Sequence, residues 1–401
     1  MSLRVVGDPE LFEKLKDLIN KINWNIEEER CNFLVQFFLM ICQDVGTEYP
    51  FPAVQHYLRP EQIQRLLWDS INYEDKELGY DPGDLFIEVA GLEGYKDEPD
   101  VDENGIISPR RSTPIHQAVK NCEKPRDWIQ VIGDLFQIYN RFDVNYTDET
   151  GYTHFHAACQ FGCVEAVQSF LEHGQDPNCI VPQTGDSALH IVSSCPELNN
   201  DMMVLLLRGG ADSNLANKQG LTPLHTIAEL CWDAKIVIEQ FFLTNDELNQ
   251  LVHIDARDKL GNTPLHLALK EGWAKVVEVL LRRGASPNLA NDGGHTPLHV
   301  ICARDQFHAD DLAEFFFKIN DELNQRVQID ARDKLGRTPL QLALSNLGVY
   351  TVKSLLNRGV DLSNFVLRNS SQFDERFQSG LYKIVNIREV LLLMAVHRQL
   401  T

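Results

Sequence analysis

Short apolar stripes separated by polar turns recur through most of the chain. In the unit that begins at Gly261, Thr263 precedes Pro264, a pair suited to the N-cap and first position of a helix. Gly272 ends this helix, and a second apolar stripe follows, formed by Val276, Val277, Val279, Leu280 and Leu281. This spacing places the apolar side chains on one face of a helix. The pattern therefore predicts a pair of short helices in each unit.

The unit is repeated along the chain. The sequence Thr-Pro-Leu-His or a close variant begins at seven positions, namely Thr113, Thr153, Ser187, Thr222, Thr263, Thr296 and Thr338. Successive starts lie 40, 34, 35, 41, 33 and 42 residues apart. A period near 33 residues is typical of ankyrin repeats, and the longer intervals indicate units with an insertion of about eight residues.

From about residue 110 to residue 364, this pattern closely resembles the ankyrin-repeat family. The resemblance implies an all-α solenoid of helix-turn-helix units joined by β-turn or hairpin loops. The sequence departs from the usual motif at His154 and Ala188, where Pro is usual, and at Gln341, where His is usual. These departures affect local geometry at the start of the helix rather than the fold.

A longer repeat of 75 residues is superimposed on the first. Ile-Asp-Ala-Arg-Asp-Lys-Leu-Gly occurs at 254–261 and 329–336, and Asn-Asp-Glu-Leu-Asn-Gln at 245–250 and 320–325. The duplicated unit is therefore a two-repeat module, an arrangement that resembles multi-copy ankyrin proteins expanded in insects. We interpret the hexapeptides as insertions, which form short helical extensions at the edge of the unit.

Two flanking segments lack the motif. Residues 1–108 form an acidic region with helix-compatible apolar spacing, which is either a separate partner-binding domain or an extended cap on the first repeat. Residues 109–364 are predicted to be the repeat domain, with about seven repeats. Residues 365–401 are predicted to form a helical cap, with recruitment of a ubiquitin ligase as the alternative role.

Composition narrows the class of partner. The formal net charge is -21, so direct nucleic-acid binding is not expected, whereas a protein partner with a basic or neutral contact surface is. The nine cysteines form no C-x-x-C pair and no apolar run is long enough to span a membrane, which indicates a protein of the cytoplasm or nucleus.

No catalytic, cofactor-binding or metal-binding residue is predicted. Six histidines recur at one position of the repeat, and we expect each to cap its own helix rather than to bind metal. They are His116, His156, His190, His225, His266 and His299. Residues 100–107 match half of an EF-hand loop, but Arg111 stands where the bidentate Glu would be required.

These features predict a non-catalytic scaffold or adaptor that binds a partner protein on its concave face, with substrate recognition for a ubiquitin ligase as the alternative. The register of the repeat places the candidate contacts at the turn between units. They are Asp148, Glu149, Lys218, Gln219, Asp258, Lys259, Leu260, Asn291, Asp292, Asp333, Lys334 and Leu335. Leu260 and Leu335 are the strongest of them, because an exposed apolar side chain can anchor a partner. A matching pair inherited by duplication is the structural alternative.

Overall fold

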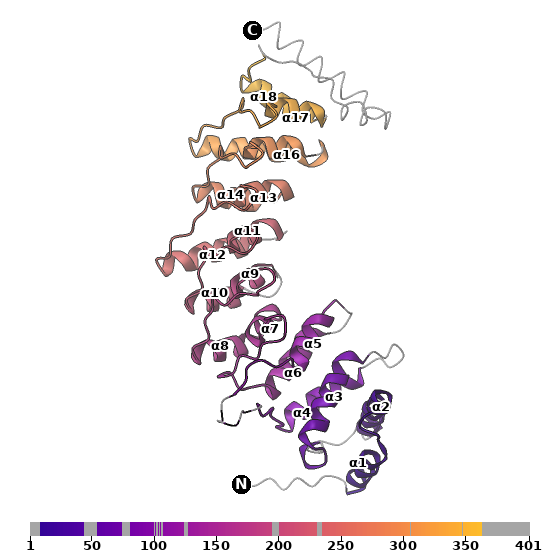
Figure 1. Cartoon of the computed structure of the whole chain (residues 1–401). Coiled ribbons are helices and arrows are strands. Elements are labelled where there is room, and N and C mark those ends of the chain that lie inside the picture. Colours follow the sequence, from indigo (N-terminus) through magenta and orange to yellow (C-terminus); the bar gives the residue numbers. More distant parts are fainter. Residues whose placement is uncertain are drawn as a thin grey trace, which may run out of the picture. The chain divides into compact units, whose positions relative to one another are not determined.

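A computed structural model describes residues 9–43, 54–73, 81–99, 101, 103, 105, 107–123, 127–194, 200–230, 235–304, 306–346 and 348–362. These residues are mainly helical and contain no β-strand (Figure 1), in agreement with the predicted all-α class. The chain divides into two compact units, residues 1–183 and 184–401. The predicted C-terminal cap, and with it the predicted ligase-recruiting role, lies outside the described residues.

The first unit begins with helices that precede the Thr-Pro-Leu-His motif. They are α1 (Pro9–Lys21), α2 (Glu27–Gln43), the 3-10 helix η1 (Val54–His56), α3 (Pro60–Asn72) and α4 (Pro82–Leu92). The motif-bearing pairs follow as α5 (Pro114–Asn121) with α6 (Trp128–Ile138), and α7 (His154–Gln160) with α8 (Val164–Glu172).

Helices α3 and α4 stack on the first motif-bearing pair as though they were a repeat themselves. Helix α3 packs against α5 and α4 against α6, just as α5 packs against α7 in the next step. Gly83 allows α3 and α4 to approach closely, because a Cβ atom there would lie 2.6 Å from the Ser70 carbonyl oxygen. The helical character predicted for this region is therefore present, and residues 60–92 extend the stack by one pair.

The start of α3 carries a sequence motif related to the one that begins each repeat. Before α3, the Gln62 side chain accepts a hydrogen bond from the Arg59 N–H at 2.8 Å. Before α17 (Pro339–Ser345), Gln341 accepts one from the Thr338 N–H at 2.9 Å in the same way. Arg59-Pro-Glu-Gln is thus a diverged copy of Thr-Pro-Leu-Gln, which a search for Thr-Pro-Leu-His does not detect.

A buried polar network joins these helices to the repeats. Asp97, only 5% exposed, accepts hydrogen bonds from Gln64 at 2.8 Å and from both terminal nitrogens of Arg111 at 3.0 Å. The Tyr146 hydroxyl donates to the same carboxylate, and the Tyr139 hydroxyl donates to Gln64. A buried carboxylate with this many donors is fully compensated, so the network holds α3 against the first two repeats.

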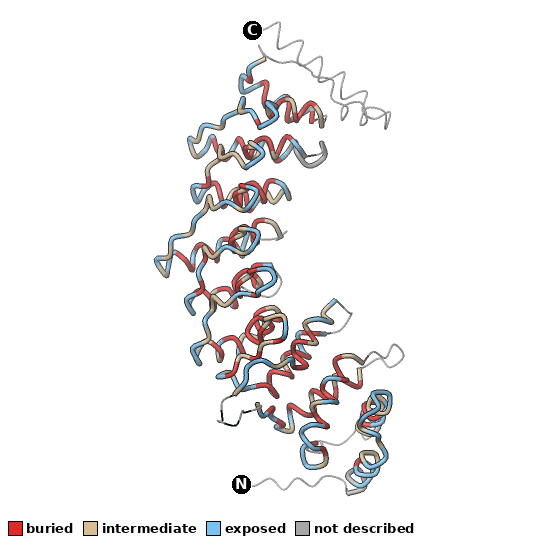
Figure 2. Tube along the Cα trace, viewed as in Figure 1, coloured by how far each residue is buried: buried red, intermediate tan, exposed pale blue. Residues whose placement is uncertain are grey.

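The described residues of the second unit form five helix pairs in two layers. The first helices, α9, α11, α13, α15 and α17, stack in order, and the second helices, α10, α12, α14, α16 and α18, stack beside them. Figure 2 shows that buried residues lie along the helices of this unit, whereas the turns that connect them are largely exposed or intermediate. The bounds are Ala188–Ser193, Asn200–Arg208, Pro223–Leu230, Lys235–Glu247, Pro264–Glu271, Ala274–Arg282, Pro297–Ala303, Gln306–Glu322, Pro339–Ser345 and Val349–Asn357 for α9 to α18.

The predicted capping role of the histidines is confirmed. In the pair that begins at Thr263, the His266 Nδ1 atom accepts the Thr263 N–H at 3.1 Å. Its Nε2 atom lies 3.0 Å from the carbonyl oxygen of His295, which belongs to the next repeat. The sequence indicated only the local bond. The second bond, to the next repeat, has counterparts at His116, His156, His190, His225 and His299.

His154, which replaces the usual proline, has a different structural role. Its ring is buried, and its Nε2 atom lies 2.6 Å from the Thr113 hydroxyl of the preceding repeat. The rings of Phe136, Tyr139 and Tyr146 surround it edge-on. Burial lowers the pKa of His154 well below its usual value, so the ring is neutral and acts as a link within the first unit.

The interpretation of the repeated hexapeptides as insertions is wrong. Residues 245–250 and 320–325 comprise the last residues of α12 and α16 and the turn that ordinarily follows such a helix. Asn249 and Asn324 have φ values of 55° and 54°, the left-handed conformation that Gly284 adopts after α14. Most of the additional residues lie earlier, since α12 and α16 have 13 and 17 residues and α14 has 9. Two more lie after Asn249 and after Asn324, because 14 residues lead from each to the next motif threonine, against 12 from Gly284.

Candidate protein-binding tips

Four turns of the second unit, which we call the tips, connect one repeat to the next. They comprise Asn217–Gly220, Asp258–Gly261, Asn291–Gly294 and Asp333–Gly336. In each, the first side chain accepts the backbone N–H groups two and four residues later, as Asp258 does from Leu260 at 2.8 Å and from Asn262 at 2.7 Å. The fourth residue is a glycine with φ between 73° and 79°. The tips are therefore Asx turns closed by a residue in the left-handed region.

Backbone hydrogen bonds join successive tips. The Lys259 N–H donates to the Gln219 carbonyl at 2.9 Å, the Asp292 N–H to the Leu260 carbonyl at 2.9 Å, and the Lys334 N–H to the Gly293 carbonyl at 3.0 Å. The tips thus form a continuous ladder whose backbone N–H groups are used internally. A partner would meet side chains rather than unpaired backbone N–H groups.

The structure separates the predicted contact residues into two groups. The residues in the first position of each turn direct side-chain oxygens into it, and they are Asp148, Asp258, Asn291 and Asp333. Asp148 and Asp333 are also buried. The residues in the second and third positions are exposed, and they are Glu149, Lys218, Gln219, Lys259, Leu260, Asp292, Lys334 and Leu335. Among these, Glu149 lies in the first unit.

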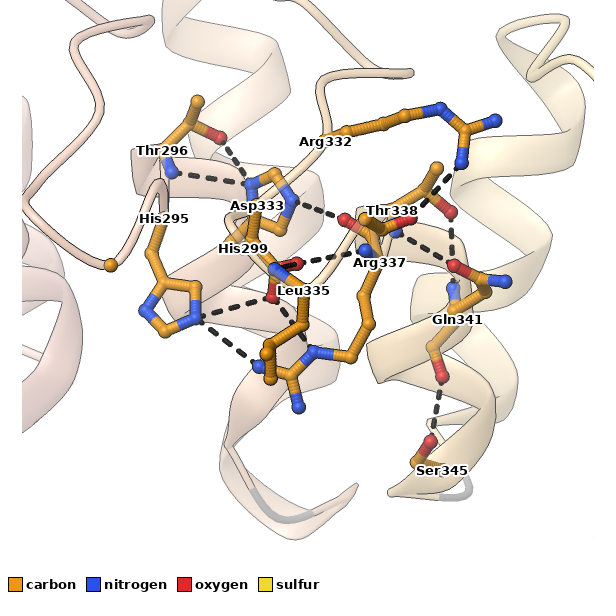
Figure 3. A network of polar contacts seen from close by, with 12 residues as sticks. His295, Thr296, His299, Arg332, Asp333, Leu335, Arg337, Thr338, Gln341 and Ser345 are labelled. Carbon is orange, nitrogen blue, oxygen red and sulfur yellow. Dashed lines mark hydrogen bonds and ion pairs between the residues drawn. The ribbon is translucent and has the colours of Figure 1, made fainter. Parts of the chain in front are cut away.

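Asp333 illustrates how the first position is held. Its carboxylate lies 2.7 Å from Arg337 Nε and 3.4 Å from His295 Nε2 (Figure 3). Burial alone would raise the pKa of Asp333, but the N–H groups and guanidinium of Arg337 and the N–H of Leu335 outweigh it and hold the pKa below its usual value. The ionised carboxylate therefore belongs to the framework of the tip.

Two leucines occupy the third position of their tips and point into solvent. Leu260 is 68% exposed and Leu335 is 72% exposed. Their 75-residue spacing places one intervening tip between them, and the third residue of that tip is Gly293, which has no side chain. The surface therefore presents two apolar side chains with an open position between them.

Comparisons with known proteins agree with this architecture. A family model of ankyrin repeats in three copies matches residues 189–291 and 277–365, and a model of ankyrin repeats in many copies matches residues 155–195. The chain belongs to the ankyrin-repeat family. Ankyrin repeats generally mediate protein–protein interaction, and members of the family are generally non-catalytic.

Several ankyrin proteins are similar to parts of the chain. It is 32% identical over 139 residues to neurogenic locus notch homolog protein 1 of Danio rerio, covering 35% of this chain and 5% of that protein. It is 29% identical over 199 residues to the nuclear factor NF-kappa-B p105 subunit of Gallus gallus, covering 48% and 19%. With an ankyrin repeat protein of fowlpox virus it shares 28% over 211 residues, covering 49% and 54%. The chain therefore covers at most about half of the length of these three relatives, and only small parts of the first two.

The described residues offer no group of three His, Cys, Asp or Glu side chains that could hold a metal ion. Three cysteines of the described repeats, Cys159, Cys179 and Cys302, are unsuited to act as nucleophiles. Burial raises the pKa of Cys159 and Cys302, and it raises the pKa of Cys179, 3.5 Å from His156 Nε2, to about 12. Such thiols remain protonated at neutral pH.

No described helix is both long and apolar enough to cross a membrane.

Proposed function

We propose that the chain is a protein-binding scaffold or adaptor of the cytoplasm or nucleus whose partner contacts the tips of the second unit. The observation that carries this proposal is the exposure of Leu260 and Leu335 on turns whose backbone N–H groups are already hydrogen-bonded. Neither side chain contributes to the turn, so the fold has no need of leucine there. Exposed apolar side chains on a rigid framework are the common anchors of protein interfaces.

The repeated octapeptide supports the same proposal. Its aspartates at 258 and 333 close the turns, and those at 255 and 330 accept the N–H groups of Ser286 and Asp361. These residues have structural reasons to recur. The Lys-Leu pair has none in the described structure, which favours a role in contacts with another molecule.

Substitution of both leucines tests the proposal. In the double variant Leu260→Asp with Leu335→Asp, we expect the proteins crosslinked to the wild-type chain in a cell extract to be lost, while the helical circular dichroism is unchanged. The matched control is Leu243→Asp with Leu251→Asp, since these leucines are 51% and 76% exposed but lie outside the tips. Loss of the same proteins in both double variants, or in neither, would remove the tips from the proposed interface.

A further inference from the structure

We infer that the tips of the second unit bind an acidic protein segment that carries two apolar side chains. This inference rests on the proposed function and adds the chemistry of the partner. It reverses what the net charge suggests, because a chain of charge -21 favours a basic or neutral partner. The exposed second positions of the tips are instead mainly lysines.

Lysines occupy the second position in three of the four tips, as Lys218, Lys259 and Lys334. All three are exposed, and none forms an ion pair or a side-chain hydrogen bond with the residues that the structure describes. The fourth tip carries Asp292 in this position, but its carboxylate lies 3.4 Å from the Arg257 guanidinium. The second positions of the tips therefore present mainly positive charge. Asp292 is paired with Arg257 and Asp333 with Arg337, and the Asp258 carboxylate accepts N–H groups within its own turn.

Cations elsewhere in the second unit are commonly matched by neighbouring carboxylates. Arg208 pairs with Glu247, Arg283 with Asp246, and Arg358 with Asp321. Each of these arginines links the second helices of two neighbouring repeats, so its charge is neutralised within the protein. The tip lysines join nothing in the described structure, and their ammonium groups remain available to an acidic ligand.

The leucines set the spacing of the apolar groups in the partner. Helices α13, α15 and α17 pack in succession, and packed helices lie about 8–10 Å apart. Two such steps separate Leu260 and Leu335 by roughly 16–20 Å, which corresponds to about five or six residues of extended chain or about 11–13 residues of helix. Within these ranges, a spacing of about six residues in an extended segment, or of about eleven in a helix, places the two apolar side chains on one face of the segment.

These features together define the ligand. Two apolar side chains of the partner would cover Leu260 and Leu335, and its carboxylates would meet Lys259 and Lys334. Because charged contacts outside the apolar centre act mainly on specificity and association rate, the lysines would select acidic segments over basic ones with similar apolar groups. Salt would weaken the selection, since the Debye length falls from about 10 Å at 0.1 M to about 3 Å at 1 M.

A displayed library of random 16-residue peptides, selected on the full chain, tests the inference. We expect enriched peptides to be acidic, to contain two apolar residues, and to bind Lys259→Glu with Lys334→Glu about tenfold or more weakly. The control Lys235→Glu with Lys353→Glu makes the same change in net charge on α12 and α18, and it should retain binding.

The outcomes distinguish the two proposals. Peptides that require the leucines but are basic or neutral would overturn the acidic partner and leave the tip interface standing. Enriched peptides that bind equally well to the Leu260→Asp, Leu335→Asp variant would overturn both. A dimer in analytical ultracentrifugation that the tip-lysine variant abolishes would assign the tips to a second copy of the chain and overturn the separate partner.

Discussion

At the scale of single residues, the histidines of the motif are held in one tautomer. Because the Thr263 N–H donates to Nδ1 of His266, that nitrogen carries no proton and Nε2 donates to the next repeat. Burial lowers the pKa of His266, and it lowers that of His116 to about 4 from a usual 6.5. The same direction holds for His156, His190, His225 and His299. The neutral ring is therefore the form that the fold requires.

Acidification should destabilise the protein through these rings. A histidine whose pKa is lower in the folded state than in the unfolded state contributes its full stabilisation above pH 6.5, and loses it as the pH falls toward 4. We expect the melting temperature to fall between pH 7 and pH 5, measured by circular dichroism. A His266→Gln variant should lose about 1 kcal/mol at pH 7.5, since the bond to the next repeat is lost. The melting temperature of this variant should also fall less than that of the wild-type chain between pH 7 and pH 5.

The natural residue Gln341 supports the choice of glutamine, because it keeps the bond to the threonine N–H without titrating. If the variant and the wild-type chain lost melting temperature equally between pH 7 and pH 5, His266 would have no part in the acid sensitivity.

At the scale of helices, the acidic ends of α12 and α16 are stabilised by their neighbours. Carboxylates at the C-terminus of a helix oppose its dipole. The Arg358 guanidinium lies 4.2 Å from the centre of the Phe317 ring and 2.5 Å from Asp321. Arg283 contacts Phe242 and Asp246 in the same arrangement. The repeated hexapeptide is thus part of a clamp between repeats, which explains its duplication without a ligand.

The clamp predicts unequal losses for two arginines. Arg358→Ala should lower the free energy of unfolding by about 1 kcal/mol, because it removes both the ring contact and the ion pair. Arg208→Ala removes only an exposed pair with Glu247 at 3.3 Å and should cost less than about 0.5 kcal/mol. Urea unfolding measures both. Equal losses would show that the contact with Phe317 contributes nothing.

Two glycines test the packing of α3 and α4. Gly83→Ala should destabilise the first unit by about 1–3 kcal/mol, because its Cβ would meet the Ser70 backbone. Gly133→Ala in α6 should stabilise it by about 0.5–1 kcal/mol, since no atom beyond the neighbouring residues and backbone of α6 lies within 4 Å of the added Cβ and alanine favours the helix. Thermal unfolding distinguishes the two signs. A neutral or stabilising Gly83→Ala would contradict the close contact of these helices.

At the scale of the whole molecule, charge is distributed unevenly between framework and surface. The net charge of -21 is compatible with a basic row of tips, because many acids of the second unit are paired with arginines or close the turns. Total composition therefore describes solubility better than it describes the binding surface. The chemistry of the binding surface depends on which exposed side chains have no partner within the repeats themselves.

The sequence alone determined the helix pairs and their family. The N-cap threonine, the proline at the first helical position and the left-handed glycine each act on residues close to them in sequence. A single repeat therefore contains enough information to predict its helices. Spacing alone also predicted that residues such as Lys259 and Leu260 lie at the turns.

Only the tertiary structure decided which surfaces are free. It assigned Asp258 to the turn, Leu260 to solvent and residues 245–250 to the end of a helix, and it joined α3 and α4 to the stack. The physical reason is that these roles depend on partners about one repeat away or further, such as Arg283 for Asp246. A periodic sequence specifies each unit locally, but burial and pairing are properties of neighbouring units in contact.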